Sequence, residues 1–286
     1  MPGVLQIFIL AIVQGMCELL PVSSSAHVIM AEKLMGLDPT TPAMTFLLVM
    51  LHTGTMLAVI AYFWNSWRSR YFASTAAFWS FARTAVVATL CTGVIGLGLM
   101  RVIEHLLRRS SPGADVEQLF GNMTLIAVSL AAVGSMIILS GLRATMVGGR
   151  QVVTVADAVW IGLVQGLCLP FRGFSRSGAT ISTGLLRGVL QRPLEDFSFA
   201  LAVILTPAVI AREGIRLFKA CVILDSAGAP VGSIWPSLVG MILSFAAGWL
   251  ALKWLSRWLE RGRWQYFGFY CLVAGLAVFI AGQHYQ

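Results

Sequence analysis

The stretch Gln14-Gly15-Met16-Cys17-Glu18-Leu19-Leu20-Pro21-Val22-Ser23-Ser24-Ser25-Ala26-His27 decides the fold, because it sets polar chemistry inside an otherwise apolar segment. It carries a carboxylate, three consecutive hydroxyls and an imidazole within one short run. A charged side chain at bilayer depth costs ~2.5–3.5 kcal/mol on insertion scales, so an intramembrane glutamate is a functional-site hypothesis by default. We therefore expect Glu18 to face a ligand or a partner group.

A second stretch, Gln165-Gly-Leu-Cys-Leu-Pro-Phe-Arg-Gly-Phe-Ser-Arg-Ser-Gly-Ala-Thr180, repeats the first without a gap. The matching pairs are Gln14 with Gln165, Gly15 with Gly166, Cys17 with Cys168, Ser24 with Ser175, Pro42 with Pro193 and Thr55 with Thr206. One offset relates all of these pairs, so the chain carries two copies of one structural device.

Composition indicates a polytopic membrane protein. Of the 286 residues, 58% are hydrophobic and only 11% are charged, against roughly 25% charged in typical soluble domains. The mean hydropathy is +0.83. The net charge of +8 lies mainly between apolar runs rather than on one basic face, so no nucleic-acid partner is expected. The five cysteines have no CxxC spacing, which argues against a disulfide framework or a zinc site.

Proline and serine interrupt the first apolar run, and the segments on either side are too short to cross a bilayer. Residues 2–20 and 21–36 are therefore expected to form a re-entrant helical hairpin whose tip lines a buried or wet cavity. The following segments are expected to be spans and a second hairpin: Ala43–Phe63, Thr84–Met100, Asn122–Leu142, the hairpin of Val155–Phe171 and Ser175–Gly188, Phe197–Leu217, Trp235–Leu252 and Trp264–Gly282. Asn65–Arg83 and Arg101–Phe120 are expected to be loops.

Each copy then holds one hairpin and three spans, so the second copy must enter the membrane from the opposite side. We predict an all-α polytopic membrane protein with one membrane domain over 1–286, built from inverted repeats at 1–142 and 155–283. Inverted repeats with discontinuous helices place their site where the two copies face each other near the midplane. The groups expected to approach one another there are Glu18, Ser24 and His27 from the first copy and Ser175, Arg176 and Thr180 from the second.

Basic residues set the orientation. In this topology one side collects Arg68, Arg70, Arg83, Arg143, Arg150, Arg187, Arg192, Lys253, Arg257, Arg261 and Arg263, and that side should be cytoplasmic. Arg101, Arg108 and Arg109 fall on the other side and weaken the asymmetry. Both termini and the entry to the first hairpin are then expected outside.

The second tip has the chemistry of an anion site. A guanidinium offers a planar fork that matches phosphate oxygens, and Arg176 stands among small polar residues. Ser175, Ser177, Thr180 and the backbone N–H groups opening the next helix add neutral donors and a positive dipole end. Arg176 could instead be a structural cation paired with Glu18. Arg172 is a second phosphate contact or a snorkelling side chain.

The first tip has the chemistry of a phosphoanhydride hydrolase. Glu18 follows Gln14 by one helical turn, so both project from one face. Ser23, Ser24, Ser25 and His27 add hydroxyl nucleophiles and a proton carrier, and the carboxylate can hold a divalent cation or act as a base. Mid-span His52 is expected to be a helix-packing hydrogen bonder. Asp157 is expected to be solvated near a helix end.

Two regions resemble the signature regions of the undecaprenyl-diphosphate phosphatase family, the bacitracin-resistance proteins. They are Gln-Gly-x-x-Glu-Leu-Leu-Pro-Val-Ser-Ser-Ser-x-His at 14–27 and Gly-Phe-Ser-Arg-Ser-Gly-Ala-Thr at 173–180, and the likeness extends through 51–59 and 196–202 to essentially the whole chain. The functional positions that the resemblance implies are Gln14, Glu18, Ser24, His27, Ser175, Arg176 and Thr180. Ala26 stands where the family usually has Gly, and Arg172 where it usually has Pro.

The resemblance implies a multi-pass enzyme of the bacterial inner membrane, with its site open to the periplasmic side. It would remove the terminal phosphate of undecaprenyl diphosphate with Mg²⁺ or Ca²⁺ held by Glu18 and Gln14, and so recycle the lipid carrier of peptidoglycan synthesis. An isoprenyl-phosphate flippase is the rival from another class, because inverted repeats around broken helices are also a transporter architecture. A paralogue acting on another lipid phosphate is a further alternative. The lipid chain length, the metal and the choice between monomer and homodimer stay open.

Overall fold

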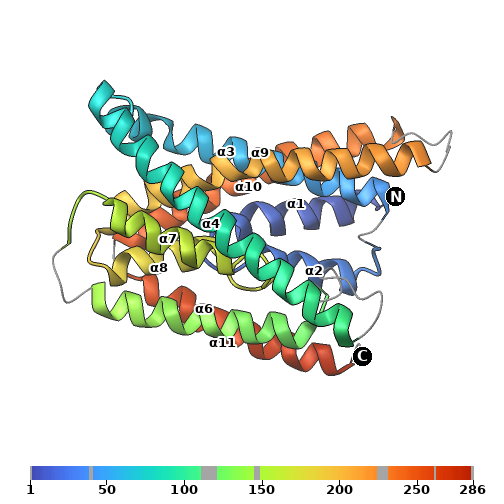
Figure 1. Ribbon diagram of the computed structural model, residues 1–286. Coiled ribbons are helices and arrows are strands. Elements are labelled where there is room, and N and C mark those ends of the chain that lie inside the picture. Colours follow the sequence, from blue (N-terminus) through green and yellow to red (C-terminus); the bar gives the residue numbers. More distant parts are fainter. Residues whose placement is uncertain are drawn as a thin grey trace. The chain divides into compact units, whose positions relative to one another are not determined.

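A computed structural model describes residues 2–38, 41–110, 121–144, 149–223, 231–260 and 262–284, and its regular elements over these ranges are helices (Figure 1). The helices are α1 (Val4–Leu19), α2 (Ser24–Leu34), α3 (Pro42–Arg70), α4 (Thr75–Ser110), α6 (Met123–Ala144), α7 (Val155–Leu167), α8 (Arg176–Leu186), α9 (Gln191–Ile223), α10 (Val231–Glu260) and α11 (Trp264–His284). The expectation of an all-α chain is confirmed for the described residues.

Within the described residues, five helices are long and apolar enough to cross a membrane: α3, α4, α6, α10 and α11. The helices α1 and α7 are apolar but shorter, as the hairpin prediction requires. The predicted span Phe197–Leu217 is helical as part of α9, yet it is not among these five. The chain is therefore a multi-pass membrane protein. That Phe197–Leu217 also crosses the membrane, as one of three spans in the second copy, stays a prediction.

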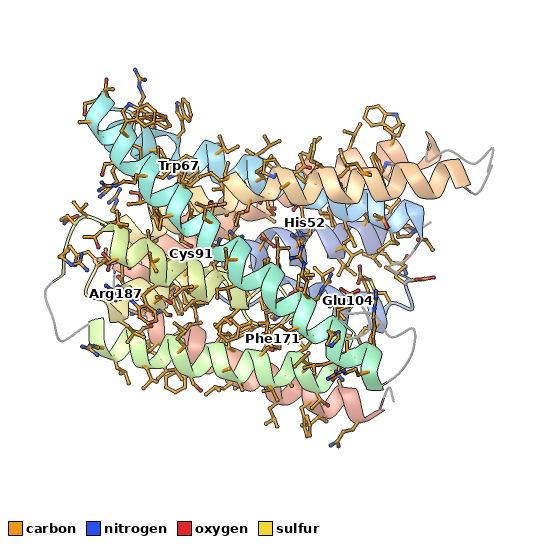
Figure 2. All side chains as sticks on the ribbon, in the orientation of Figure 1. His52, Trp67, Cys91, Glu104, Phe171 and Arg187 are labelled. Atoms are coloured by element: carbon orange, nitrogen blue, oxygen red, sulfur yellow. The ribbon has the colours of Figure 1, made fainter. Side chains whose placement is uncertain are left out.

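The predicted loop at Asn65–Arg83 is wrong. α3 continues to Arg70, and α4 already begins at Thr75. The end of α3 is anchored instead of exposed: the indole N–H of buried Trp67, labelled in Figure 2, donates to the Asp196 backbone carbonyl at 3.0 Å, and Arg70 pairs with the Asp196 carboxylate at 2.9 Å. These long-range contacts hold the helix beyond the apolar stretch.

The loop predicted at Arg101–Phe120 is also wrong in its first half, because α4 continues to Ser110; residues 111–120 lie outside the described part. A helix of 36 residues is about 54 Å long, while a bilayer core is about 30 Å thick. The polar end of α4 therefore extends past the apolar layer as helix.

The described chain divides into two compact units. Unit 1 comprises Met1–Leu20, His27–Trp64 and Ala202–Leu255, and unit 2 comprises Pro21–Ala26, Asn65–Leu201 and Ser256–Gln286. Each unit contains segments of both expected copies, so the units do not coincide with the two repeats.

The core of unit 1 holds α1 and α2 against α3. Its buried residues are Ile7, Leu10, Ala11, Val28, Met44, Leu47 and Leu51. The Gln6 side chain donates to the Met35 carbonyl at 3.3 Å, so the start of α1 lies beside the end of α2 and the pair is a hairpin. α10 packs closely on α1, since a Cβ at Gly15 would lie 2.6 Å from the Ser244 carbonyl oxygen.

The core of unit 2 is built on α6 and α11, which lie side by side in Figure 1. They run antiparallel, because Gly141 meets Gln265 at one end and Gly282 meets Met123 at the other. α8 packs on α6 and on α7, and α7 packs on α4. The second hairpin is thus held between two long helices.

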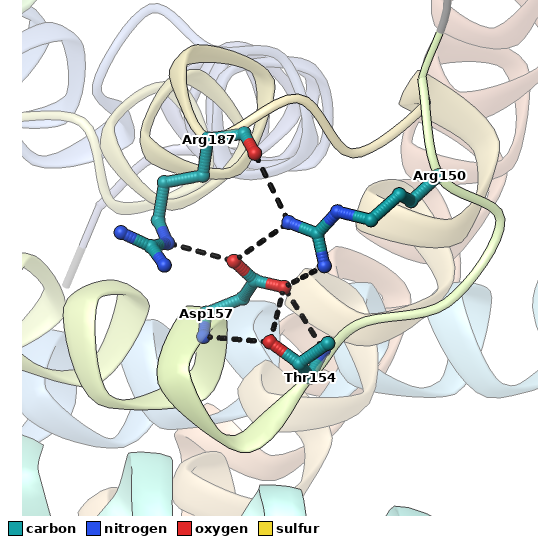
Figure 3. Close-up of polar contacts among 4 residues, drawn as sticks. All are labelled: Arg150, Thr154, Asp157 and Arg187. Carbon is teal, nitrogen blue, oxygen red and sulfur yellow. Dashed lines mark hydrogen bonds and ion pairs between the residues drawn. The ribbon is translucent and has the colours of Figure 1, made fainter.

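A buried carboxylate closes the base of that second hairpin (Figure 3). Asp157 is fully buried, so its predicted solvation is wrong. It accepts hydrogen bonds from Arg150 at 2.8 Å, from Arg187 at 2.7 Å and from the Thr154 hydroxyl at 2.7 Å. Arg187 is the C-cap of α8 and Thr154 is the N-cap of α7. The cluster therefore ties the C-terminal end of α8 to the N-terminal end of α7.

Candidate active site

The first tip, Pro21–Ala26, belongs to unit 2 and breaks the helix between α1 and α2. Ser23 has a φ of 67°, a left-handed conformation that L-residues rarely adopt, so the turn is strained at this position. The Pro21 carbonyl accepts a hydrogen bond from the Cys271 thiol of α11 at 3.4 Å. The tip is therefore fixed against α11 where the helix break was predicted.

The three hydroxyls of this tip differ in environment. Ser23 is buried, and its Oγ lies 3.3 Å from that of Ser25. Ser24 begins α2, and both Ser24 and Ser25 are half-buried. The first-turn position gives Ser24 a rigid backbone beside the positive end of the helix.

The second tip is an N-terminal helix cap in unit 2. The Ser175 hydroxyl accepts from the Gly178 N–H at 3.3 Å and caps α8, whose first residue is Arg176. Gly173 has a φ of 101°, and a Cβ there would lie 2.6 Å from the Ile126 carbonyl oxygen of α6. Only glycine fits this turn, which presents the positive end of α8 next to the Arg176 guanidinium.

Thr180 is held from two sides. Its hydroxyl donates to the Arg176 carbonyl at 2.8 Å and lies 2.6 Å from the Ser198 hydroxyl of α9. A hydroxyl group has one proton to donate. Because Thr180 donates its proton to the Arg176 carbonyl, the Ser198 hydroxyl is the donor in its hydrogen bond with Thr180. Ser198 was not among the predicted site residues, and its only signal in the sequence is its place in the resembling stretch at 196–202.

The remaining residues predicted for this tip divide by exposure. Ser177 is buried, and its hydroxyl lies 3.4 Å from the Ser175 hydroxyl. Arg176 is half-buried, and Arg172 is exposed just before the turn. Phe171, labelled in Figure 2, directly precedes it.

In unit 1, the structure brings Gln14 and Glu18 together as predicted. The Gln14 carboxamide donates to the Glu18 carboxylate at 3.2 Å, one turn along α1. Gln14 is buried, and the Glu18 side chain is 18% exposed. His27 is half-buried on α2 of the same unit.

His52 joins this pair from α3 (Figure 2). Its Nδ1 lies 2.8 Å from the Leu48 carbonyl of the same helix, one turn earlier, so the predicted hydrogen bond to another helix stays a prediction. Its Nε2 lies 3.9 Å from a Glu18 carboxylate oxygen, which the sequence did not predict. The repeat pairs α1 with α7 and contains no signal for a contact between α1 and α3.

The donors on α1 suit a hard divalent cation. Magnesium is commonly bound by one or two carboxylates, with substrate phosphates and waters completing its shell. Glu18 supplies the carboxylate, and a half-turn of the Gln14 carboxamide would present its oxygen beside it. Among the described residues there is no group of three or more His, Cys, Asp or Glu side chains, so any cation must take its other ligands elsewhere.

Comparison with known proteins identifies the family. The family model described as "Bacitracin resistance protein BacA" matches residues 7–277. A relative from Acinetobacter baylyi named "Undecaprenyl-diphosphatase 2" is 55% identical over 270 residues, covering 94% of each chain. Proteins named "Undecaprenyl-diphosphatase" from Bdellovibrio bacteriovorus and Desulfosudis oleivorans are 31% identical over 96% of this chain and 32% identical over 93% of it, covering 95% and 94% of their own lengths. The match covers nearly the whole chain and includes both signature regions. The chain therefore belongs to the BacA family of bacitracin-resistance proteins.

Proposed function

We propose that this protein hydrolyses undecaprenyl diphosphate to undecaprenyl phosphate and orthophosphate, which returns the lipid carrier to cell-wall synthesis. The observation that carries the proposal is the second tip, where the capped start of α8 and the Arg176 guanidinium form a ready site for a phosphate. The relatives that align over nearly the full chain bear the name of this activity.

Arg176 clamps the diphosphate, since its fork can bind two phosphate oxygens at once. Ser175 and Ser177 hold the first turn of α8 in shape through their mutual contact and the cap on Gly178. Thr180 is a positioning residue. Its hydroxyl donates to the Arg176 carbonyl, so it fixes the helical turn that carries the Arg176 guanidinium.

Ser24 supplies the nucleophile, or otherwise the hydroxyl that orients the attacking water. In the first case the Ser24 oxygen attacks the terminal phosphorus, the bond from that phosphorus to the bridging oxygen breaks, and undecaprenyl phosphate leaves. Water then releases orthophosphate from the serine. His27 moves the proton, and Ser23 and Ser25 donate to phosphate oxygens.

Glu18 and Gln14 hold a Mg²⁺ or Ca²⁺ ion, or Glu18 acts as the base. When bound, such an ion neutralises charge on the diphosphate and polarises its oxygens. The protein's own part is to place both side chains on one face of α1, where a half-turn of the Gln14 carboxamide would exchange their 3.2 Å hydrogen bond for a shared ion.

We also propose the inverted repeat, with copies at 1–142 and 155–283 in one membrane domain. Gly15 of α1 packs on α10 near Ser244, and its counterpart Gly166 of α7 packs on α4 near Thr92. Each hairpin therefore lies against the second long helix of the other copy. The antiparallel run of α6 and α11, the last helices of the two copies, also supports inversion.

The site is proposed to open to the periplasmic side of the inner membrane, where the substrate's diphosphate would be reached. The basic residues Arg68, Arg70, Arg150, Arg187 and Arg192 support this orientation, because they lie in the terminal turns of helices or close to helix ends on the side assigned to the cytoplasm.

Phosphate release by the purified protein distinguishes this function from its rivals. Protein in detergent is given C15 and C55 isoprenyl diphosphates and unrelated lipid phosphates, with and without Mg²⁺ or Ca²⁺. We expect orthophosphate from the isoprenyl diphosphates. Binding of isoprenyl phosphate without turnover, together with its translocation in proteoliposomes, would establish the flippase instead, and a preference for another lipid phosphate would establish a paralogous phosphatase.

A further inference from the structure

The Arg187 guanidinium is held by only one of its nitrogens. Its Nε donates to the buried Asp157 carboxylate at 2.7 Å, and the side chain is 32% exposed. In Figure 3 the dashed contact of this guanidinium starts from Nε, and its two terminal nitrogens carry none. Within the described ranges no other hydrogen bond or ion pair involves them. Because a guanidinium is planar and rigid, the anchored Nε leaves the fork of terminal nitrogens in a fixed direction.

Arg150, in contrast, is fully used inside the cluster. Its two terminal nitrogens donate to the Asp157 carboxylate at 2.8 and 3.1 Å. One of them also donates to the Arg187 carbonyl at 3.0 Å, which covers the negative end of α8. The four residues of Figure 3 hold two guanidinium groups and one carboxylate, so one positive charge stays uncompensated among them. That charge is available on the fork of Arg187.

An exposed indole lies beside this guanidinium. The central carbon of the Arg187 guanidinium is 6.0 Å from the centre of the Trp160 ring, and Trp160 is 52% exposed in the second turn of α7. α7 is an apolar helix of a multi-pass membrane protein. Exposed tryptophans near the ends of such helices lie at the membrane–water interface, at the level of the lipid headgroups. The Arg187 fork is therefore presented at the depth where lipid phosphates lie.

This place is separate from the proposed reaction site. Arg176 is the first residue of α8, and Arg187 directly follows its last residue. Eleven residues of α-helix correspond to about 16 Å. A phosphate bound at Arg187 is therefore not the phosphate that Arg176 is proposed to clamp.

We propose that Arg187 and Trp160 bind the headgroup phosphate of an anionic phospholipid such as phosphatidylglycerol. The fork and the phosphate oxygens match in geometry and are opposite in charge, and basic pockets between membrane helices are known to hold such headgroups. The Trp160 ring packs on the neighbouring glycerol and acyl carbons. Phosphatidylcholine is disfavoured, because its ammonium group would meet the uncompensated positive charge. The inference goes beyond the proposed phosphatase function, since the lipid bound here is not hydrolysed.

Native mass spectrometry tests this by titrating the full-length protein, purified in detergent and stripped of lipid, with phosphatidylglycerol. Arg187→Lys is the main variant, because lysine keeps the charge and can still bond Asp157 but has no fork. Arg68→Lys is the matched control, since Arg68 is exposed in the last turn of α3. We expect the Kd of the first phosphatidylglycerol to rise at least about fivefold in Arg187→Lys and to stay within about twofold in Arg68→Lys.

A second variant, Trp160→Leu, leaves the Asp157 cluster intact and should raise the same Kd at least about threefold. The Tm of each variant is measured in parallel, so weaker lipid binding is distinguished from unfolding. We also expect phosphatidylcholine to bind at least about tenfold more weakly than phosphatidylglycerol, and inorganic phosphate at equal concentration not to displace the lipid.

Equal Kd values in Arg187→Lys and Arg68→Lys would overturn the proposal, as would equal binding of phosphatidylcholine. Displacement by inorganic phosphate would also overturn it, because the site would then take a free anion and not a lipid. Orthophosphate release from C15 diphosphate is measured on the same wild-type preparation, so loss of the lipid site and loss of the phosphatase function remain separate results.

Discussion

Replacing Asp157 by Asn tests the buried cluster that closes the second hairpin. Asp157 accepts hydrogen bonds from two arginines, from the Thr154 hydroxyl and from the Thr154 backbone N–H at 2.9 Å. An asparagine keeps the shape but removes the charge, and its amide N–H₂ would point at groups that are themselves donors.

The size of the effect follows from exposure. Removing one partner of a buried ion pair typically costs about 3–5 kcal/mol, because the other charge is left buried. Here the Arg150 and Arg187 side chains are 45% and 32% exposed, so water can solvate them once Asp157 is neutral. We therefore expect a loss below that range, about 2–3 kcal/mol of unfolding free energy, from the lost charge-assisted hydrogen bonds.

Thermal unfolding in detergent micelles, followed by tryptophan fluorescence, measures this loss. For a chain of this size each kcal/mol corresponds to about 2–4 °C, so the Tm of Asp157→Asn should fall by about 4–12 °C. Glu104→Gln is the control, because it removes a carboxylate from an exposed pair with Arg108 on α4 and should change the Tm by about 1 °C or less. Equal shifts in the two variants would refute the argument from burial.

The pH dependence gives the same prediction a second readout. Burial alone would raise the pKa of Asp157, but hydrogen bonds from Arg150, Thr154 and Arg187 outweigh it and hold that pKa below its ordinary value. A depressed folded-state pKa adds stability that is complete above the unfolded pKa, about 3.9, and is lost as the pH falls through the folded pKa. The Tm gap between wild type and Asp157→Asn should stay constant from pH 8 to 5 and narrow only below about pH 4.

Four further predictions concern the reaction, each measured as orthophosphate release. Arg176→Lys should lose most activity, because a point charge does not replace a bidentate fork; retained activity would contradict the clamp. Ser24→Ala should keep less than about a tenth of wild-type kcat, since retention above this means that the hydroxyl supplies less than ~1.4 kcal/mol. Ser198→Ala should lower kcat/KM about fivefold by loosening Thr180, with recovery in Ser198→Thr; an unchanged value would remove its positioning role. Arg172→Pro should raise KM and soften its salt dependence if Arg172 contacts phosphate, whereas unchanged kinetics would make Arg172 a bystander.

Local sequence signals predicted the breaks in the helices well. Proline at 21 and the serines after it stop α1 at Leu19, and the Gly-Phe-Ser turn at 173–175 restarts the chain as α8. These features depend on backbone chemistry that acts within a few residues. The pairing of Gln14 with Glu18 was predictable for the same reason, because one helical turn separates them.

Long-range contacts account for what the sequence did not predict. α3 extends into the predicted loop as far as Arg70, and there Trp67 and Arg70 bind Asp196, which is far away in the chain. His52 meets Glu18 and Ser198 meets Thr180 only after helices have packed. Asp157 was assigned to solvent from its place near a helix end, and only the fold brings both arginines to it.

Following the terminal phosphate of the substrate tests the central claim most directly. Undecaprenyl diphosphate labelled only on its terminal phosphorus is incubated with the purified full-length protein, and the aqueous and lipid products are separated. We expect the label to leave as orthophosphate and the lipid product to be unlabelled undecaprenyl phosphate, with neither product above background in Arg176→Ala. Label that stays on the lipid, or that leaves as inorganic diphosphate, would contradict it.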